Sequence, residues 1–254
     1  MSSLRTVIYV LGAVAAVSLA LLVISAVELT GDVRTGVTWV FWVSFIALLV
    51  ALYARHRNAP GSDEVQVEGP GFARFLFNNR AAGLFWLPIR MFVGVAFLDA
   101  GLHKFSDPGW TQGGASLLSY WQRAAAIPEA PGRPQITYDW YRDFINFLIN
   151  GHHETWFAWL VTLGEIAIGL GLILGALTGL AAFFGALMNM SFLLAGSAST
   201  NPVLFTFAIG LILAWKVAGY YGFDRYLLPR LGTPWRPGAF FRRGQPPADP
   251  ASSA

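Results

Sequence analysis

The chain has 254 residues, of which 55% are hydrophobic and 12% charged, with a formal net charge of +3. Soluble domains carry roughly a quarter charged residues, so too little polar surface remains here to cover a water-soluble globule. The composition predicts an integral membrane protein. It does not predict nucleic-acid binding, because no stripe of Lys and Arg interleaved with aromatic residues occurs.

Six apolar runs predict an all-helical bundle of about six transmembrane helices. The runs are residues 4–27, 37–54, 84–103, 156–174, 179–194 and 202–221. The first run is too long for the apolar region of a signal peptide and lacks a convincing cleavage site, so we interpret it as a retained helix. Two N-terminal helices are thus expected within residues 1–57, and a four-helix membrane domain within residues 84–222.

The segments between the runs divide by composition. Residues 58–83 contain Pro and Gly and predict a cytoplasmic linker followed by an interfacial stretch. The outer segment, residues 104–154, is rich in aromatic residues, and two parts of it, 115–126 and 140–149, are typical of amphipathic helices at a bilayer surface. We expect this segment to pack over the outer mouth of the bundle. Residues 223–254 predict a disordered cytoplasmic tail.

The distribution of Lys and Arg predicts the orientation. With six crossings, both termini and the 58–83 linker share one side, and most Lys and Arg fall there. The outer segment carries fewer, and Asp and Glu dilute them. The positive-inside rule therefore places both termini in the cytoplasm.

Ionisable residues inside the predicted spans are candidates for function, because a charge in hydrocarbon is costly. They are Arg90, Asp99, Glu165 and Lys216. Asp99 lies on the face of its helix opposite Arg90, with His103 beside it at i+4. Lys216 is near the cytoplasmic end of its span and is expected to extend to the interface, so we assign it no role.

Arg90 and Glu165 are predicted to meet inside the bundle. The helical rise puts their Cα atoms on the order of 7 Å apart in depth, which a guanidinium can span. Asn189 on the following helix adds a polar group at membrane depth. Two interpretations stay open: a structural ion pair, or a polar pocket for a quinone head group or an anion.

Other common sites are not predicted. Cysteine is absent, which excludes disulfides, iron–sulfur ligation and electron transfer through a thiol of this chain. The histidines at 103, 152 and 153 lie at the rim of the bundle, whereas a haem usually needs histidines well inside facing helices, so we expect no metal or haem. The sequence contains no P-loop, dinucleotide fingerprint or serine nucleophile elbow.

Two segments resemble the DoxX/DoxD family of membrane proteins. RMFVGVAFLDAGLHKF at 90–105 resembles the family's signature helix, and GEIAIGLGLILGALT at 164–178 resembles its second helix. The resemblance covers about residues 84–222 and leaves the first 80 or so outside. Arg90, Lys104 and Glu165 match the family's polar positions, and the long loop between the motifs is similar to that of DoxD-like members.

The resemblance implies a membrane subunit of a quinone-linked oxidoreductase in a bacterial or archaeal plasma membrane, because the family includes the small subunit of thiosulfate:quinone oxidoreductase. The implied catalytic residues are Arg90, Glu165 and Lys104. The implied quinone-binding residues are Arg90, Asp99, His103, Glu165 and Asn189. The implied partners are membrane quinone and a second oxidoreductase subunit or soluble redox partner. Two alternatives stay open: a non-catalytic scaffold for a redox partner, or a carrier of small solutes or lipids.

Overall fold

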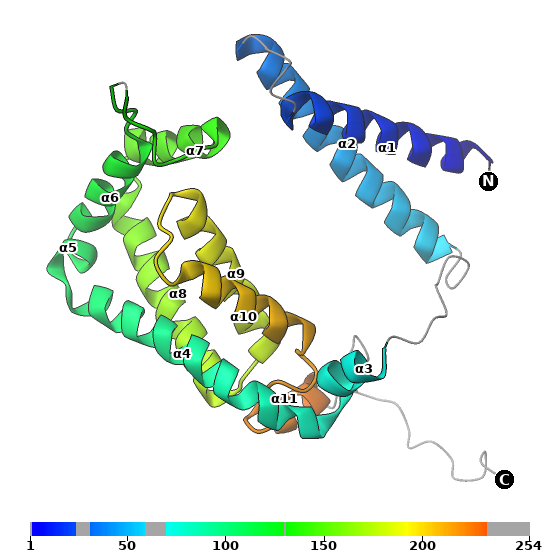
Figure 1. Ribbon diagram of the computed structural model, residues 1–254, viewed down its shortest axis with the longest axis vertical. Coiled ribbons are helices and arrows are strands. Elements are labelled where there is room, and N and C mark those ends of the chain that lie inside the picture. Colours follow the sequence, from blue (N-terminus) through cyan, green and yellow to red (C-terminus); the bar gives the residue numbers. More distant parts are fainter. Residues whose placement is uncertain (1, 24–30, 59–69, 130, 233–254) are drawn as a thin grey trace, which may run out of the picture. The chain divides into compact units, whose positions relative to one another are not determined.

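Every regular element in the described part of the chain is a helix. The computed structural model describes residues 2–23, 31–58, 70–129 and 131–232. The chain divides into two compact units, Met1–Glu68 and Gly69–Ala254 (Figure 1). The predicted all-helical class is confirmed for these residues.

The first unit is a pair of helices, α1 (Ser2–Val23) and α2 (Gly31–Asn58), that pack against each other. Small residues on these helices are buried, among them Ala15, Ser18 and Ser44. The hydroxyls of Ser18 and Ser44 each donate a hydrogen bond to a carbonyl oxygen of their own helix, at 2.8 and 2.7 Å. A hydroxyl satisfied in this way can be buried in an apolar contact at little cost.

Helix α2 begins earlier than the sequence predicts, because it includes part of the polar stretch before residue 37. Thr35 and Thr38 donate their hydroxyls to carbonyl oxygens one turn back, at 2.9 and 2.8 Å. These bonds satisfy both hydroxyls within the helix, so the polar residues do not interrupt it.

The second unit is built on four apolar helices. They are α4 (Gly83–Ser106), α8 (Glu154–Leu174), α9 (Thr178–Leu194) and α10 (Asn201–Leu213). Helix α4 packs along α8 and α9 packs along α10, while α8 and α9 also touch (Figure 1). The buried side chains between them form one core, which includes Val93, Phe97, Leu172, Ala182 and Leu211.

In the part of the chain that the structure describes, three helical segments are long and apolar enough to cross a membrane: Gly31–Arg55, Arg80–Ser106 and Glu154–Leu174. Three shorter apolar helices coincide with the remaining predicted runs. They are Thr6–Leu22, Thr178–Leu194 and Asn201–Leu213. By length and composition, the chain is therefore a helical membrane protein.

Three short helices lie at one end of the second unit (Figure 1). They are α5 (Pro108–Thr111), α6 (Ala115–Ala125) and α7 (Asp139–Asn150). Helix α6 buries Leu117 and Trp121, and α7 buries Ile145 and Leu148, at the three- and four-residue spacing of an amphipathic helix. The two amphipathic helices predicted in the outer segment therefore form, and they share a second apolar core.

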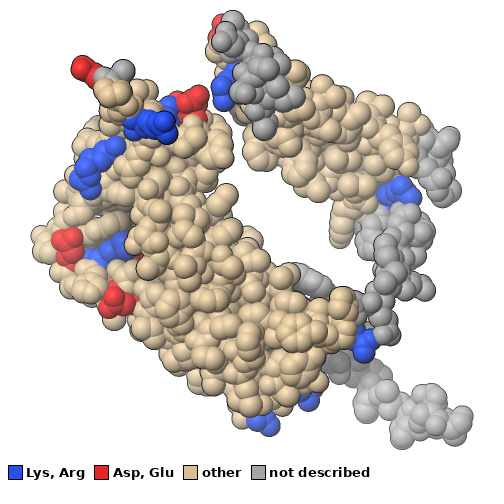
Figure 2. Space-filling model, viewed as in Figure 1, with Lys and Arg blue, Asp and Glu red and all other residues tan. Residues whose placement is uncertain are grey.

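The opposite end of this unit holds α3 (Gly71–Asn78), the 3-10 helix η1 (Arg80–Ala82) and α11 (Asp224–Leu231). The Trp86 indole donates to the Leu76 carbonyl at 2.8 Å, which ties α3 to α4. Figure 2 shows charged residues gathered at the two ends of the unit, with uncharged surface between them. That pattern is typical of a bundle whose middle lies in lipid.

The last apolar helix is shorter than predicted, since α10 ends at Leu213 and residues 214–223 form turns. The turns bring Asp224 to the junction of α8 and α9. There its carboxylate accepts hydrogen bonds from the backbone N–H groups of Leu177 and Thr178, at 2.7 and 2.9 Å. A helix continued through this segment would move the carboxylate away from these donors.

Part of the predicted disordered tail is helical, because α11 begins at Asp224 and this residue is buried. The rest of the tail, residues 233–254, lies outside the described residues, as do residues 59–69 of the predicted linker.

Candidate functional site

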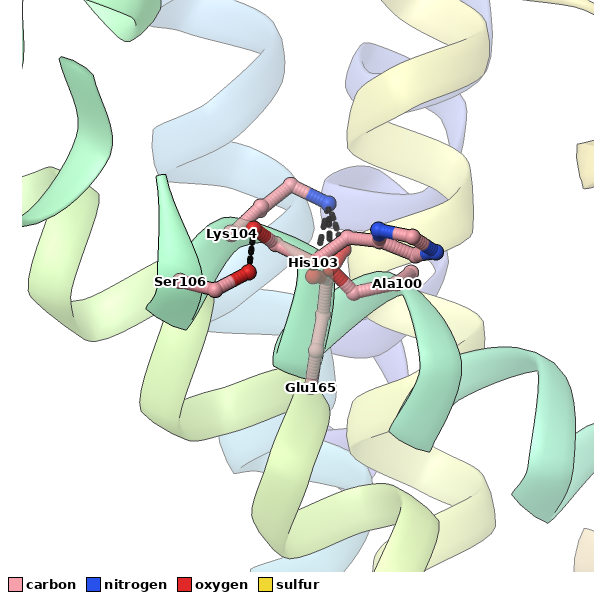
Figure 3. Close-up of polar contacts among 5 residues, drawn as sticks. All are labelled: Ala100, His103, Lys104, Ser106 and Glu165. Atoms are coloured by element: carbon pink, nitrogen blue, oxygen red, sulfur yellow. Dashed lines mark hydrogen bonds and ion pairs between the residues drawn. The ribbon is translucent and has the colours of Figure 1, made fainter. Parts of the chain in front are cut away.

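A buried ion pair joins α4 to α8. The Lys104 ammonium donates hydrogen bonds to both carboxylate oxygens of Glu165, at 2.9 and 2.7 Å (Figure 3). The Glu165 side chain is 2% exposed and that of Lys104 is 20% exposed. A third contact of the ammonium, with the Ala100 carbonyl, is long at 3.5 Å, and the Trp110 ring centroid lies 5.2 Å from Nζ. The pair is therefore buried on the Glu165 side and reachable on the Lys104 side.

Glycines at the contact between α4 and α8 set the position of this pair. A Cβ atom at Gly101 would lie 2.7 Å from a side chain of α8, and one at Gly169 would lie 2.6 Å from a backbone nitrogen of α4. The helices approach this closely because both residues lack a side chain. The two helices run antiparallel. Lys104 follows Gly101 by about one helical turn, and Glu165 precedes Gly169 by about one turn. This register places Lys104 beside Glu165.

The ion pair lies in the wall of a cavity of about 800 Å³. Most of the wall is apolar or aromatic and comes from α6, α7, α8 and α9. It includes Trp121, Phe144, Phe157, Leu160, Phe184 and Leu187. Among the described residues that line the cavity, the charged ones are Lys104 and Glu165. Cavities of roughly 300–1,000 Å³ with a few polar groups in an apolar wall are typical of sites for small organic molecules.

Two tyrosines from the outer helices, Tyr120 and Tyr141, bring phenol groups to the cavity. The Tyr141 hydroxyl donates to the Ser191 carbonyl at 2.8 Å. Burial and the neighbouring Tyr120 raise the pKa of Tyr141 to about 12, although the contact with Ser191 acts in the opposite direction. Burial also raises the pKa of Tyr120. Both phenols therefore stay protonated at neutral pH; Tyr141 donates its proton to Ser191, and Tyr120 can donate to a ligand.

Arg90 lies toward the other end of α4 and does not meet Glu165. Its Nη2 donates to the Tyr221 carbonyl at 3.2 Å, and its guanidinium packs directly against Gly175. The helical rise separates Arg90 from Lys104 by about 21 Å along α4. The predicted pair of Arg90 with Glu165 is therefore wrong. The prediction ended the apolar run at residue 103 and did not pair Lys104 with Glu165, whereas α4 continues to Ser106 and brings Lys104 to this carboxylate.

Three further residues predicted to bind quinone lie outside the cavity wall. Asp99 and His103 form an i,i+4 pair at 3.6 Å, and their side chains are 72% and 79% exposed. Asn189 is buried in α9, and its amide has no hydrogen-bond partner among the described residues. Among the residues proposed from the sequence, the structure brings Lys104 and Glu165 together at the cavity.

The sequence analysis missed two features. It noted aromatic residues in the outer segment, but the packing of α5–α7 decides that Trp110, Tyr120 and Tyr141 reach the cavity. It also assigned no role to Asp224. A signal for this residue exists, because α9 has no acidic residue in its own first turn and a helix N-terminus favours a negative charge.

The groups that face the cavity can donate hydrogen bonds and exchange protons. Lys104 and the phenols are donors, and the buried carboxylate of Glu165 accepts from Lys104. No group of three or more His, Asp or Glu side chains suited to a metal ion occurs among the residues searched, which are those that the structure describes.

The fold and the site define a helical membrane protein with an ion pair buried beside a largely apolar cavity. The DoxX family model matches residues 85–196, which include both motif helices and most of the cavity wall. The resemblance to this family seen in the sequence is therefore confirmed over residues 85–196. The match ends before α10, short of the residue 222 that the resemblance reached. Comparisons with curated proteins and with solved structures found no significant match.

Proposed function

We propose that the protein is the membrane subunit of a quinone-linked oxidoreductase, and that the quinone head group binds beside Lys104 and Glu165. The observation that carries the proposal is an apolar cavity of about 800 Å³ into which a buried ion pair offers one hydrogen-bond donor. The match of residues 85–196 to the DoxX family model supports a membrane role, and the resemblance to the small subunit of thiosulfate:quinone oxidoreductase supports quinone as the ligand.

The residues at the cavity fit a quinone head group, which is a flat apolar ring with two carbonyl oxygens. The Trp121 and Phe157 rings offer aromatic surfaces for such a ring. Lys104 and Tyr120 offer donors for the carbonyl oxygens. The long 3.5 Å contact of Lys104 with the Ala100 carbonyl is the weakest of the ammonium's bonds, so it is the one that a ligand oxygen would replace.

A bound quinone supplies two-electron, two-proton redox chemistry at its carbonyl oxygens. In this proposal Lys104 orients one carbonyl oxygen by donating a hydrogen bond to it. Glu165 holds the ammonium in place through two hydrogen bonds and balances its charge. The Lys104 ammonium places a proton of Nζ beside that oxygen. Helices α6 and α7 contribute apolar side chains to the wall and limit the access of water.

We propose thiosulfate as the electron donor, on the family resemblance. Two thiosulfate ions release two electrons when a sulfur–sulfur bond forms between them, and one quinone with two protons takes up both electrons. Since the chain has no cysteine, a second subunit or soluble redox partner is proposed to carry the electrons. The exposed Trp140, Phe144 and Phe147 of α7 offer a surface for such a partner. The same surface supports the alternative, a scaffold that anchors a redox partner and binds no quinone.

The function test is saturable quinone binding to the purified protein in lipid nanodiscs, followed by extraction and quantification of the bound quinone. We expect about one quinone per chain, because the cavity has one buried ion pair. Membranes that contain the protein and its partner are expected to reduce quinone when thiosulfate is added, and membranes without the protein are the control. Absence of saturable binding for every quinone tested would overturn the proposal. Binding without thiosulfate-dependent reduction would overturn only the proposed donor.

We further propose six spans, with both termini in the cytoplasm of a bacterial or archaeal cell. Six apolar helices support this topology, although three of them are short for a crossing. The excess of Lys and Arg on the side of the termini supports the orientation.

Single cysteines test this topology cleanly, since the chain has none of its own. The substitutions are Gln135→Cys in the outer segment, Ser62→Cys in the linker and Ser252→Cys near the C-terminus. In intact cells, an impermeant thiol reagent is expected to label Gln135→Cys alone. After the cells are opened, the other two are expected to react. Labelling of Ser252→Cys from outside would contradict the topology.

A further inference from the structure

We propose that the ligand enters the cavity sideways from the bilayer, between α8 and α9, and that this groove holds the ligand's long apolar tail. This proposal rests on the proposed function. It adds the route by which the ligand enters and the part of the ligand, its apolar tail, that the groove recognises. The groove is defined by six residues of α8 and α9 that line the cavity. They are Leu160, Gly164, Ala167, Phe184, Leu187 and Met188.

The groove connects the ion pair with the outer surface of the bundle. Leu160 and Leu187 are 56% and 52% exposed, yet both line the same cavity as the buried Glu165. Ala167 and Phe184 are also exposed and also line it. Because α8 is long and apolar enough to span the membrane, these exposed side chains lie where lipid chains would contact the protein. The cavity is therefore open toward the bilayer along these two helices.

The chemistry of the groove selects a ligand with one polar end and one apolar chain. All six of its residues are apolar, and the charged residues of the cavity, Lys104 and Glu165, lie at its wall away from the lipid side. A small water-soluble anion would gain nothing from such a groove. A prenyl chain, which is at home in lipid, can lie along such a groove while its head group reaches the ion pair.

Gly164 keeps the groove open. A Cβ atom there would meet only Met188, at 3.5 Å or more, which is an ordinary contact distance. By contrast, a Cβ atom at Gly169 on the same helix would lie 2.6 Å from the backbone of α4. Gly169 is therefore required for helix packing, whereas Gly164 is not. The missing side chain at Gly164 leaves space that a ligand can occupy.

The test uses two quinones with the same head group, one with a full-length prenyl chain and one with a methyl group in its place. The variant is Gly164→Leu, which fills the groove without touching the ion pair. The matched control is Leu163→Phe, on the neighbouring exposed position of α8 that does not line the cavity. Affinities are measured by titration in nanodiscs, and folding by thermal melting.

We expect Gly164→Leu to weaken long-chain binding about tenfold, which is roughly 1.4 kcal/mol, while short-chain binding and Leu163→Phe stay near wild type. Equal loss of both quinones, or loss of neither, would overturn the inference and leave the proposed function standing. A bound phospholipid that the long-chain quinone cannot displace, seen by native mass spectrometry, would also overturn it. Failure of the wild type to bind either quinone would overturn the proposed function as well.

A second variant keeps the test decisive if Gly164→Leu does not fold. Ala167→Leu fills the same groove from an exposed position of α8. The same selective loss of the long-chain quinone is expected. If Ala167→Leu folds and binds both quinones like the wild type, the tail does not lie between α8 and α9.

Discussion

Replacing Lys104 with Met is expected to abolish quinone binding and to lower the free energy of unfolding by about 3–5 kcal/mol. The Glu165 carboxylate is 2% exposed and accepts two hydrogen bonds from Lys104. Without the ammonium, a buried charge would be left uncompensated, and this accounts for the loss of stability. Glu165→Gln is also expected to lower the free energy of unfolding, because the Lys104 ammonium then loses its counter-charge.

The double variant Lys104→Met/Glu165→Gln separates stability from function. Removing both charges leaves no unpaired ion, so the melting temperature is expected to recover most of the loss. Quinone binding is expected to stay absent, since the donor is gone. Asp139→Asn is the matched control: it breaks another ion pair of 2.7 Å, but the Asp139 side chain is 59% exposed, so a loss below about 1 kcal/mol is expected. Wild-type quinone binding in the double variant would contradict the assigned role of the pair.

Replacing Asp224 with Ala is expected to destabilise the end of the bundle where α8 meets α9 by about 3–5 kcal/mol. The carboxylate accepts two backbone hydrogen bonds at the start of α9, at 2.7 and 2.9 Å. The Asp224 carboxylate also places a negative charge near the Arg90 guanidinium. The Arg90 side chain is buried, and its Nε and Nη1 have no hydrogen-bond partner among the described residues. Asp224→Ala therefore removes the two acceptors at the start of α9 and a negative charge near the buried Arg90 guanidinium.

A double-mutant cycle distinguishes these two contributions. If Arg90 and Asp224 are coupled, Arg90→Met added to Asp224→Ala should cost less than the sum of the two single losses. The exposed Asp143→Ala is the control for loss of an acidic residue and is expected to change stability by less than about 0.5 kcal/mol. Thermal melting in detergent measures the wild type, the two single variants, the double variant and the control. An Asp224→Ala protein as stable as the Asp143→Ala control would contradict the assigned role of this carboxylate.

The fold class and the positions of most helices could be predicted from the sequence, because both depend on local composition. The apolar runs at 84–103, 156–174 and 179–194 differ from α4, α8 and α9 by at most about three residues at either end. The amphipathic helices at 115–126 and 140–149 followed from the three- and four-residue spacing of their apolar side chains. Glu165 could likewise be selected as a candidate from its position in an apolar run, because a charge in hydrocarbon is costly.

What the tertiary structure decided is which groups meet. Depth along separate helices predicted that Glu165 would face Arg90, but the close contacts at Gly101 and Gly169 set the register of α4 and α8 and bring Lys104 to Glu165 instead. The end of α10 depended likewise on a contact distant in sequence, the hydrogen bonds of Asp224 with the start of α9. An ion pair gains most of its energy over a few ångströms, and helix propensity carries no information about a neighbouring helix at that distance. The sequence by itself therefore determined most of the elements and the candidates Lys104 and Glu165, and the packing between helices decided their partners and the role of Asp224.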